Sequence, residues 1–161
     1  MLTGKEIIEK GIITNYCDAG VQQQGVDLRI KCIRRVNGSS ISLIPKEGKT
    51  QLPDYDEWDG WSDKFCLSPG YYEVEFMEGC NIPKNCAMWL KTRSSLVRCG
   101  ATVHSGQFDA GFNTKNAGCF LEVRFNMDIE RHARIAQAIL FTSNDVDNLY
   151  DGQWQNDKQR K

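Results

Sequence analysis

Short runs of alternating apolar and polar residues, separated by turn signals, are the feature that most constrains this fold. The clearest run is 26–32, where Val, Leu, Ile and Cys alternate with Asp, Arg and Lys. A period of two predicts a strand that buries one face. Asn37-Gly38 predicts a hairpin turn, after which residues 40–44 return as a strand. Further strands are predicted at 71–77, 86–91, 102–104, 119–125 and 136–142. Many short strands predict a mainly β barrel or sandwich.

The first residues carry the signals of a short helix. Thr3 and Glu6 have the spacing of a capping box, and Gly11 is placed to end the helix. Ile7 and Ile8 are then expected to face inward. A helix this short is not stable alone, so we expect it to dock on the β domain.

Two polar stretches stand apart from the predicted strands. Residues 45–64 contain two prolines, many charges, Trp58 and Trp61, which predicts a loop or insertion that covers a neighbouring surface. Residues 144–161 are polar apart from Tyr150 and Trp154, which predicts a tail that folds over another part of the protein. The predicted organisation is therefore one β domain at 1–143 and a C-terminal tail at 144–161.

Composition excludes several classes of protein. The 161 residues suffice for one domain with a core, and 20 Lys and Arg balance 21 Asp and Glu, so no basic excess indicates nucleic-acid binding. No apolar run approaches the roughly 18 residues of a membrane span, and the first residues are too polar for a signal peptide. Seven cysteines without Cys-x-x-Cys spacing, and two histidines, disfavour a zinc site. Buried thiols in a reducing cytoplasm are the expectation.

One stretch, 89–109, concentrates side chains that suit a phosphate ester. Arg93, Ser94, Ser95 and Arg98 offer guanidinium and hydroxyl donors for phosphate oxygens, and a turn there adds backbone N–H groups. An ordinary capped helical turn with solvated arginines explains the same spacing. The residues alone leave both interpretations open.

A carboxylate follows this donor cluster. Asp109 stands among the small residues Gly106, Ala110 and Gly111, where the backbone is able to approach a ligand closely, and Phe112 is able to lie under a sugar ring. A simple Asp-Ala-Gly turn is the alternative.

A second carboxylate, Glu122, lies in the predicted strand 119–125. Alternation places Cys119, Leu121, Val123 and Phe125 on the core face, and Glu122 on the opposite face. A solvated or interface role is the plain expectation for Glu122.

Several blocks in order resemble the dUTPase and dCTP deaminase superfamily. The blocks are Gly25-Val26-Asp27-Leu28, Leu67-Ser68-Pro69-Gly70, Ile82-Pro83, Arg93-Ser94-Ser95-Leu96-x-Arg98-x-Gly100, Gly106 to Phe112, Ala133 to Gln137, and Tyr150 to Gln155. Together they cover nearly the whole chain, and the last resembles the C-terminal motif of the deaminase-like branch.

The resemblance implies a β-clip fold of distorted antiparallel sheets, assembled as a homotrimer with sites between subunits and Mg²⁺ mainly on the triphosphate rather than on the protein. It implies that Asp109 orients the attacking water, and that Phe112 packs on the deoxyribose. The implied phosphate-binding residues are Arg93, Ser94, Ser95, Arg98 and Gln137. The implied nucleoside-binding residues are Gly106, Gln107, Phe112, Tyr150, Gln153 and Gln155, with the tail closing over the nucleotide.

The resemblance leaves the reaction open. A dUTP diphosphatase uses a water-holding carboxylate and releases dUMP and diphosphate, whereas a dCTP deaminase uses a glutamate as general base, for which Glu122 is the candidate. Counting back from Asn126 places Val123 at the glutamate's position, and counting forward from Leu121 places Glu122 there. Because alternation turns Val123 inward, we predict a dUTP diphosphatase. A dCTP deaminase or bifunctional enzyme is second, and an inactive nucleotide-sensing regulator is third.

Overall fold

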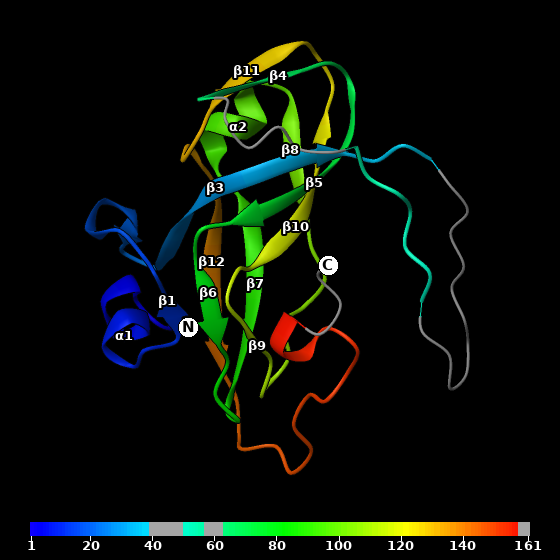
Figure 1. Cartoon of the computed structure of the whole chain (residues 1–161). Coiled ribbons are helices and arrows are strands. Elements are labelled where there is room, and N and C mark those ends of the chain that lie inside the picture. Colours follow the sequence, from blue (N-terminus) through cyan, green and yellow to red (C-terminus); the bar gives the residue numbers. More distant parts are fainter. Residues whose placement is uncertain (39–49, 57–62, 158–161) are drawn as a thin grey trace.

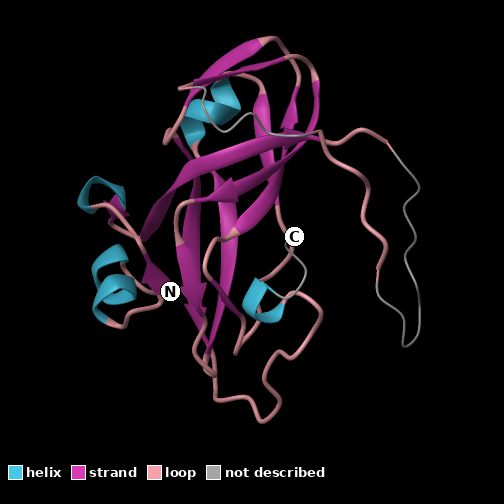
Figure 2. Cartoon of the chain, viewed as in Figure 1, coloured by secondary structure: helices cyan, strands magenta, loops and turns pink. Residues whose placement is uncertain are grey.

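Antiparallel strands form most of the molecule, and its helices are short and lie at the edges (Figure 2). The structure is a computed structural model and describes residues 1–38, 50–56 and 63–157. The predicted strand at 40–44 and the residues Trp58 and Trp61 lie outside the described residues. Among the described residues, no helix is long and apolar enough to cross a membrane.

One large antiparallel sheet curves into a near-closed barrel (Figure 1). Its order is β7 (Cys86–Thr92), β12 (Arg134–Thr142), β3 (Gly25–Arg35), β5 (Gly70–Phe76), β10 (Gly118–Val123) and β8 (Ala101–His104), and β2 (Val21–Gln22) also pairs with β3. The two outermost strands meet, because the Val103 N–H donates to the Thr92 hydroxyl over 2.9 Å. The mainly β fold expected from the alternating runs is confirmed.

Smaller elements complete the fold. A three-stranded sheet contains β1 (Ile13–Thr14), β6 (Gly79–Asn81) and β9 (Asn113–Thr114), and a two-stranded sheet pairs β11 (Met127–Glu130) with β4 (Lys64–Leu67). The helices are α1 (Gly4–Glu9), α2 (Ser94–Arg98) and the 3₁₀ turns η1 (Asp18–Gly20) and η2 (Gln155–Asp157). The strands missed from the sequence have two to four residues, too few to show a period.

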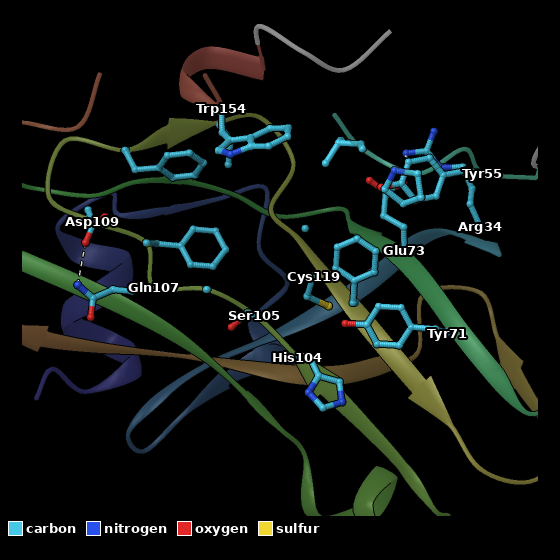
Figure 3. Close-up of a pocket in the computed structure, with 18 of the residues that line it drawn as sticks. Arg34, Tyr55, Tyr71, Glu73, His104, Ser105, Gln107, Asp109, Cys119 and Trp154 are labelled. Carbon is cyan, nitrogen blue, oxygen red and sulfur yellow. Dashed lines mark hydrogen bonds and ion pairs between the residues drawn. The ribbon is translucent and has the colours of Figure 1, made fainter. Parts of the chain in front are cut away.

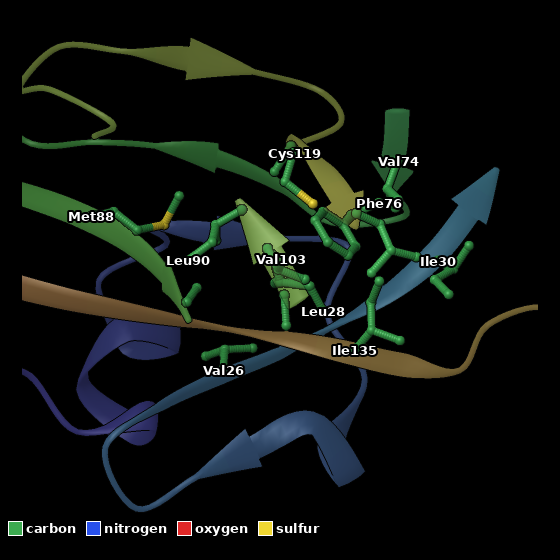
Figure 4. Packing of buried hydrophobic residues seen from close by; sticks show 14 of the residues in the cluster. Val26, Leu28, Ile30, Val74, Phe76, Met88, Leu90, Val103, Cys119 and Ile135 are labelled. Carbon is green, nitrogen blue, oxygen red and sulfur yellow. The ribbon is translucent and has the colours of Figure 1, made fainter. Parts of the chain in front are cut away.

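The core fills the inside of the curved sheet with aliphatic and aromatic side chains, among them Val26, Leu28, Phe76 and Met88 (Figure 4). β3 departs from simple alternation, because its register with β5 shifts between Ile30 and Cys32. The bulge moves the inward side of the strand by one residue, so Ile33, opposite Val74, belongs to the core cluster, whereas Cys32, expected on the core face, lies opposite Glu75 and outside that cluster.

Helix α1 has the predicted ends. Thr3 and Glu6 form the capping box, and Gly11 adopts a φ of 64° just after the C-cap. The Ile12 N–H bonds to the Ile7 carbonyl over 3.1 Å, which is the Schellman arrangement. Ile7 and Ile12 are fully buried, so the helix docks on the core as expected.

The prediction for strand 119–125 was partly wrong. β10 ends at Val123, and Phe125, expected on the core face, is 65% exposed. The Arg124 N–H bonds to the Gly100 carbonyl, so the chain leaves the sheet before it reaches Phe125. Up to that point the alternation is correct: Leu121 and Val123 are buried.

Candidate active site

A cavity of about 930 Å³ lies between the turn after β8, the start of β10, part of β5 and the C-terminal tail (Figure 3). Its walls include the predicted Gly106, Gln107, Asp109, Phe112 and Tyr150. They also include residues that had no predicted role, namely Arg34, Leu52, Pro53, Asp54, Tyr55, Tyr71, Glu73, His104, Ser105, Phe108, Thr114, Gly118, Cys119, Phe120 and Trp154. Five of the residues implied for nucleoside and water binding are therefore gathered at one hollow.

Asp109 sits on a tight turn at the edge of this cavity. The Phe112 N–H donates to the Asp109 carbonyl over 3.0 Å, and Gly111 adopts a φ of 86°, a left-handed conformation that glycine tolerates best. The Gly111 N–H bonds to the Ile82 carbonyl over 2.9 Å, which ties the turn to the body of the protein. The carboxylate itself is exposed and accepts a 2.7 Å hydrogen bond from the Gln107 amide (Figure 3).

Aromatic rings back the turn. Phe112 packs edge-on against Phe108, with ring centres 5.4 Å apart, and against Tyr150, with ring centres 5.3 Å apart. Edge-to-face pairs of this kind fix ring orientation. The arrangement gives the cavity an apolar wall beside the Asp109 carboxylate, which suits a sugar or base next to a polar reacting group.

The tail lies over the same turn. The Tyr150 N–H donates to the Ala110 carbonyl over 2.8 Å. The Gln155 side chain accepts from the Asn113 N–H and donates to the Gly111 carbonyl, both over 2.8 Å. A Cβ on Gly111 would lie 2.7 Å from the Leu149 Cβ, so the tail approaches the turn closely.

Two tail glutamines that the resemblance assigned to the nucleoside form hydrogen bonds within the protein. The Gln155 amide is engaged with backbone at both ends, and the Gln153 oxygen accepts from the Thr50 N–H over 3.1 Å. In this arrangement both side chains hold the tail and the 50–56 segment in place.

The phosphate-binding candidates lie elsewhere on the chain. Arg93 precedes α2, where its Nε lies 3.0 Å from the Asp27 carboxylate and its Nη1 donates to the Arg134 carbonyl over 2.9 Å. Asp27 is 1% exposed, and its carboxylate is also 3.6 Å from Arg134 Nη1. Burial raises the pKa of the Asp27 carboxyl, against the opposing effect of Arg93 and Arg134.

Ser94, Ser95 and Arg98 are exposed on α2, and Gln137 is half-buried on β12, opposite Lys91 and Asp27 in the neighbouring strands. None of these four, nor Arg93, is among the described residues that line the cavity. Met88 pairs with Phe108, and Arg93 lies five positions further along the chain, which corresponds to about 16 Å of extended strand. Within a single chain, the cluster of arginine and serine side chains therefore lies apart from Asp109.

Glu122 is also outside the cavity walls. Its carboxylate lies 3.0 Å from His104 Nε2 and 3.4 Å from Arg124 Nε, and its side chain is 39% exposed. The hydrogen bond from His104 is the main cause that lowers the pKa of the Glu122 carboxyl, with a further contribution from Arg124. Such an environment favours a permanently ionised carboxylate. A group that must both take up and release a proton near neutral pH needs the opposite shift.

Mg²⁺ binds through oxygen ligands, chiefly carboxylates, waters and phosphates. The described residues contain no group of three or more His, Cys, Asp or Glu side chains placed to hold a metal. Mg²⁺ commonly keeps its waters and binds through one or two carboxylates plus substrate phosphates, so such a group is not needed. Asp109 is an exposed carboxylate at the cavity that fits this limited role. An ion carried mainly by the triphosphate stays a prediction.

The sequence did not single out several residues at the cavity. Tyr71 and Phe120 stack there with ring centres 5.0 Å apart, although they come from different strands. Trp89 contacts Gln107 from β7. One signal was present: Trp89 stands between two buried residues in an alternating run, which places a large aromatic side chain outward. Cross-strand stacking has no such signal in a single sequence.

The architecture has a counterpart among solved structures. The 2′-deoxycytidine 5′-triphosphate deaminase from Agrobacterium tumefaciens superimposes with a TM-score of 0.65 at 18% identity, covering 88% of this chain and 47% of that longer chain. This likeness shows the fold alone, a mainly β architecture that the two proteins share.

Sequence comparison identifies the family of the chain. A family model described as dCTP deaminase-like matches residues 3–143, so the chain belongs to the dCTP deaminase-like family. The deoxyuridine 5′-triphosphate nucleotidohydrolase from Methanocaldococcus jannaschii is 34% identical over 146 residues, which cover 89% of this chain and 92% of the relative. The superfamily resemblance carried by the sequence blocks is confirmed.

Proposed function

We propose that this protein is a dUTP diphosphatase that hydrolyses dUTP to dUMP and diphosphate. The observation that carries the proposal is the exposed Asp109 carboxylate, which lies at the edge of a cavity walled by Phe112 and Tyr150. The similarity to the nucleotidohydrolase from Methanocaldococcus jannaschii along most of both chains supports the same reaction.

In the proposed mechanism, Asp109 accepts a hydrogen bond from a water molecule. This contact directs a lone pair of the water oxygen at the α-phosphorus. A bond forms between the water oxygen and phosphorus, and the bond to the oxygen that bridges the α- and β-phosphates breaks. Diphosphate leaves with the bonding electrons, and the proton of the water passes to the Asp109 carboxylate. Charge neutralisation of the triphosphate is the contribution that a bound Mg²⁺ supplies.

Arg93, Ser94, Ser95, Arg98 and Gln137 are proposed to hold the phosphates, with Phe112 against the deoxyribose. The separation of Arg93 from Asp109 in one chain supports a site built between copies. A homotrimer, in which one copy presents the arginine cluster to the cavity of another, closes this gap. The tail, 144–161, is proposed to close over the nucleotide with Tyr150, and the contacts of Gln153 and Gln155 support a role in ordering that cover.

A cytoplasmic location belongs to the same proposal. The seven cysteines, all within the described residues, form no disulfide bond, which supports a reducing compartment.

dCTP deamination is the second candidate, because the matching family model is dCTP deaminase-like and Glu122 is present. Three observations favour the diphosphatase. Val123 is the buried residue of the pair, Glu122 is absent from the described cavity walls, and the His104 contact lowers the pKa of the Glu122 carboxyl.

A product assay tests the proposal. The protein is incubated with dUTP or dCTP, with and without Mg²⁺, and dUMP, diphosphate and ammonia are measured. We expect dUMP and diphosphate from dUTP in the presence of Mg²⁺. Ammonia from dCTP would establish deamination, and no turnover of either nucleotide would favour a nucleotide-sensing regulator.

A further inference from the structure

A chain of two hydrogen bonds connects the outer face of the sheet to Asp109. Trp89 Nε1 donates to Gln107 Oε1 over 3.0 Å, and Gln107 Nε2 donates to Asp109 Oδ1 over 2.7 Å. Trp89 lies on β7 between the buried residues Met88 and Leu90, so its ring points away from the core. The chain therefore begins outside the cavity and ends on the carboxylate that is proposed to hold the water.

The donors and acceptors on the three side chains allow this pair of hydrogen bonds to run in one direction only. The indole N–H only donates, so the Gln107 oxygen must face Trp89. The amide nitrogen of Gln107 then faces Asp109, whose ionised carboxylate only accepts. Trp89 thus excludes the flipped amide, which would turn the Gln107 oxygen toward the Asp109 carboxylate and repel it.

The same bond decides which carboxylate oxygen is left for a water. Gln107 occupies Oδ1, and the described residues provide no hydrogen-bond partner for Oδ2. Holding one oxygen fixes the rotation of the carboxylate, so the other has a defined direction. Positioning of this kind contributes to catalysis because the reacting atoms are already aligned.

Trp89 is itself held in place. Its ring packs on Phe141, with centres 4.8 Å apart, and Lys91 Nζ lies 5.6 Å from the ring centre. Met88 and Phe108 exchange two backbone hydrogen bonds of 3.0 Å, which join β7 to the segment that contains Gln107. The indole on β7 and the Gln107 amide on the bridged segment are therefore held at a fixed separation.

We propose that Trp89 and Gln107 are positioning residues that orient the Asp109 carboxylate for catalysis. The inference rests on the proposed diphosphatase function and deepens it. Gln107 acts on the carboxylate in this account, rather than on the nucleoside as the family resemblance implies.

Kinetics of three variants test the proposal. Trp89→Phe keeps an aromatic ring and removes the N–H, and Gln107→Ala removes the amide. Each is expected to lower kcat for dUTP by roughly five- to tenfold, the equivalent of one hydrogen bond, with KM nearly unchanged. Tyr16→Phe is the control, since it removes the hydroxyl of an exposed ring outside the cavity walls, and its kcat is expected to stay at the wild-type value.

The double variant separates positioning from general structural damage. If Trp89 acts through Gln107, adding Trp89→Phe to Gln107→Ala produces no further loss. Additive losses, or a rise in KM without a fall in kcat, would overturn the proposal. Equal losses in Tyr16→Phe and Trp89→Phe would also overturn it, because an effect unrelated to the hydrogen bonds would then explain both.

A second readout does not depend on activity. The protein has four tryptophans, and the indole N–H resonance of Trp89 is identified by its loss in Trp89→Phe. Gln107→Ala is expected to shift that resonance, since it removes the acceptor, and an unshifted resonance would refute the hydrogen bond. If the resonance shifts but the wild-type protein does not hydrolyse dUTP, the bonded chain stands and the proposed function fails.

Discussion

The Arg93 region and the Asp109 turn are held by different kinds of contacts. Arg93 is fixed from within, by the buried Asp27 carboxylate and the carbonyl of Arg134. The Asp109 turn is fixed from outside, by the exposed Gln107 amide and by the tail residues Tyr150 and Gln155. The comparison shows that the core itself sets the position of Arg93, whereas the Asp109 turn depends on peripheral segments that open more easily.

These different contacts suit the Arg93 region and the Asp109 turn to different tasks. A preset cluster of donors suits the triphosphate, whose charge is the same in every substrate nucleotide. A turn that is covered by the tail suits the step in which water must be admitted, aligned and then enclosed. Substitutions in the two regions should therefore differ in what they change.

The largest effect is expected at the Asp109 carboxylate. Asp109→Ala should lower kcat for dUTP by about a thousandfold or more, because the water loses its acceptor. Thermal unfolding should be nearly unchanged, since the side chain is exposed. Asp145→Ala, which removes another exposed aspartate, is the control. Turnover near the wild-type level in Asp109→Ala would remove this residue from its role.

The core-anchored half is tested at Asp27. Asp27→Asn should raise KM for dUTP by roughly tenfold, because Arg93 and Arg134 lose the charge that aligns them. An unchanged KM would show that the anchor is not needed.

The same variant has a defined pH dependence. The pKa of Asp27 is raised in the folded state, so its contribution to stability is fully present below the unfolded pKa and is lost as pH rises through the folded pKa. The unfolding free energy of the wild-type protein, relative to Asp27→Asn, should therefore fall over that window. Chemical unfolding at several pH values measures it, and a relative increase with pH would contradict the assignment.

The tail contact should have a smaller effect. Gln155→Ala removes two hydrogen bonds to the turn, each worth about 1 kcal/mol, so KM for dUTP should rise by roughly fivefold or more. Gln155→Glu keeps the acceptor for the Asn113 N–H but cannot donate to the Gly111 carbonyl, and it should behave like the alanine variant. Hydrogen exchange at Tyr150 reports tail release directly, and unchanged protection in both variants would refute the clamp.

The smallest effect is expected at Glu122. Glu122→Gln preserves size and the contact with His104, and should change dUTP hydrolysis by less than about twofold, as surface substitutions usually do. Loss of dUTP turnover in this variant would return Glu122 to the reaction and favour the deaminase interpretation.

The sequence predicted the parts of this molecule that depend on local pattern. The strand at 26–32, the capping box at Thr3 and the inward orientation of Val123 are local, and the structure has each of them. The bulge at Ile30 and the early end of β10, which exposes Phe125, depend on partner strands and leave no local signal.

The site shows the same limit. Family blocks identified Asp109, Phe112 and Tyr150, which the fold brings to one cavity. They did not indicate that the Gln155 amide is engaged by backbone, or that Asp27 binds Arg93. Those contacts join residues far apart in the chain, and side-chain chemistry alone does not determine which of several possible partners is chosen.

Mixing two inactive variants tests most directly whether the two halves of the site come from different copies. Chains with Asp109→Ala and chains with Arg93→Ala are co-expressed, and mixed oligomers are verified by mass. In a random mixture, about a quarter of the sites combine an intact Asp109 from one copy with an intact Arg93 from another, so roughly that fraction of dUTP hydrolysis should return. Mixed oligomers without any recovered activity would contradict a site shared between copies.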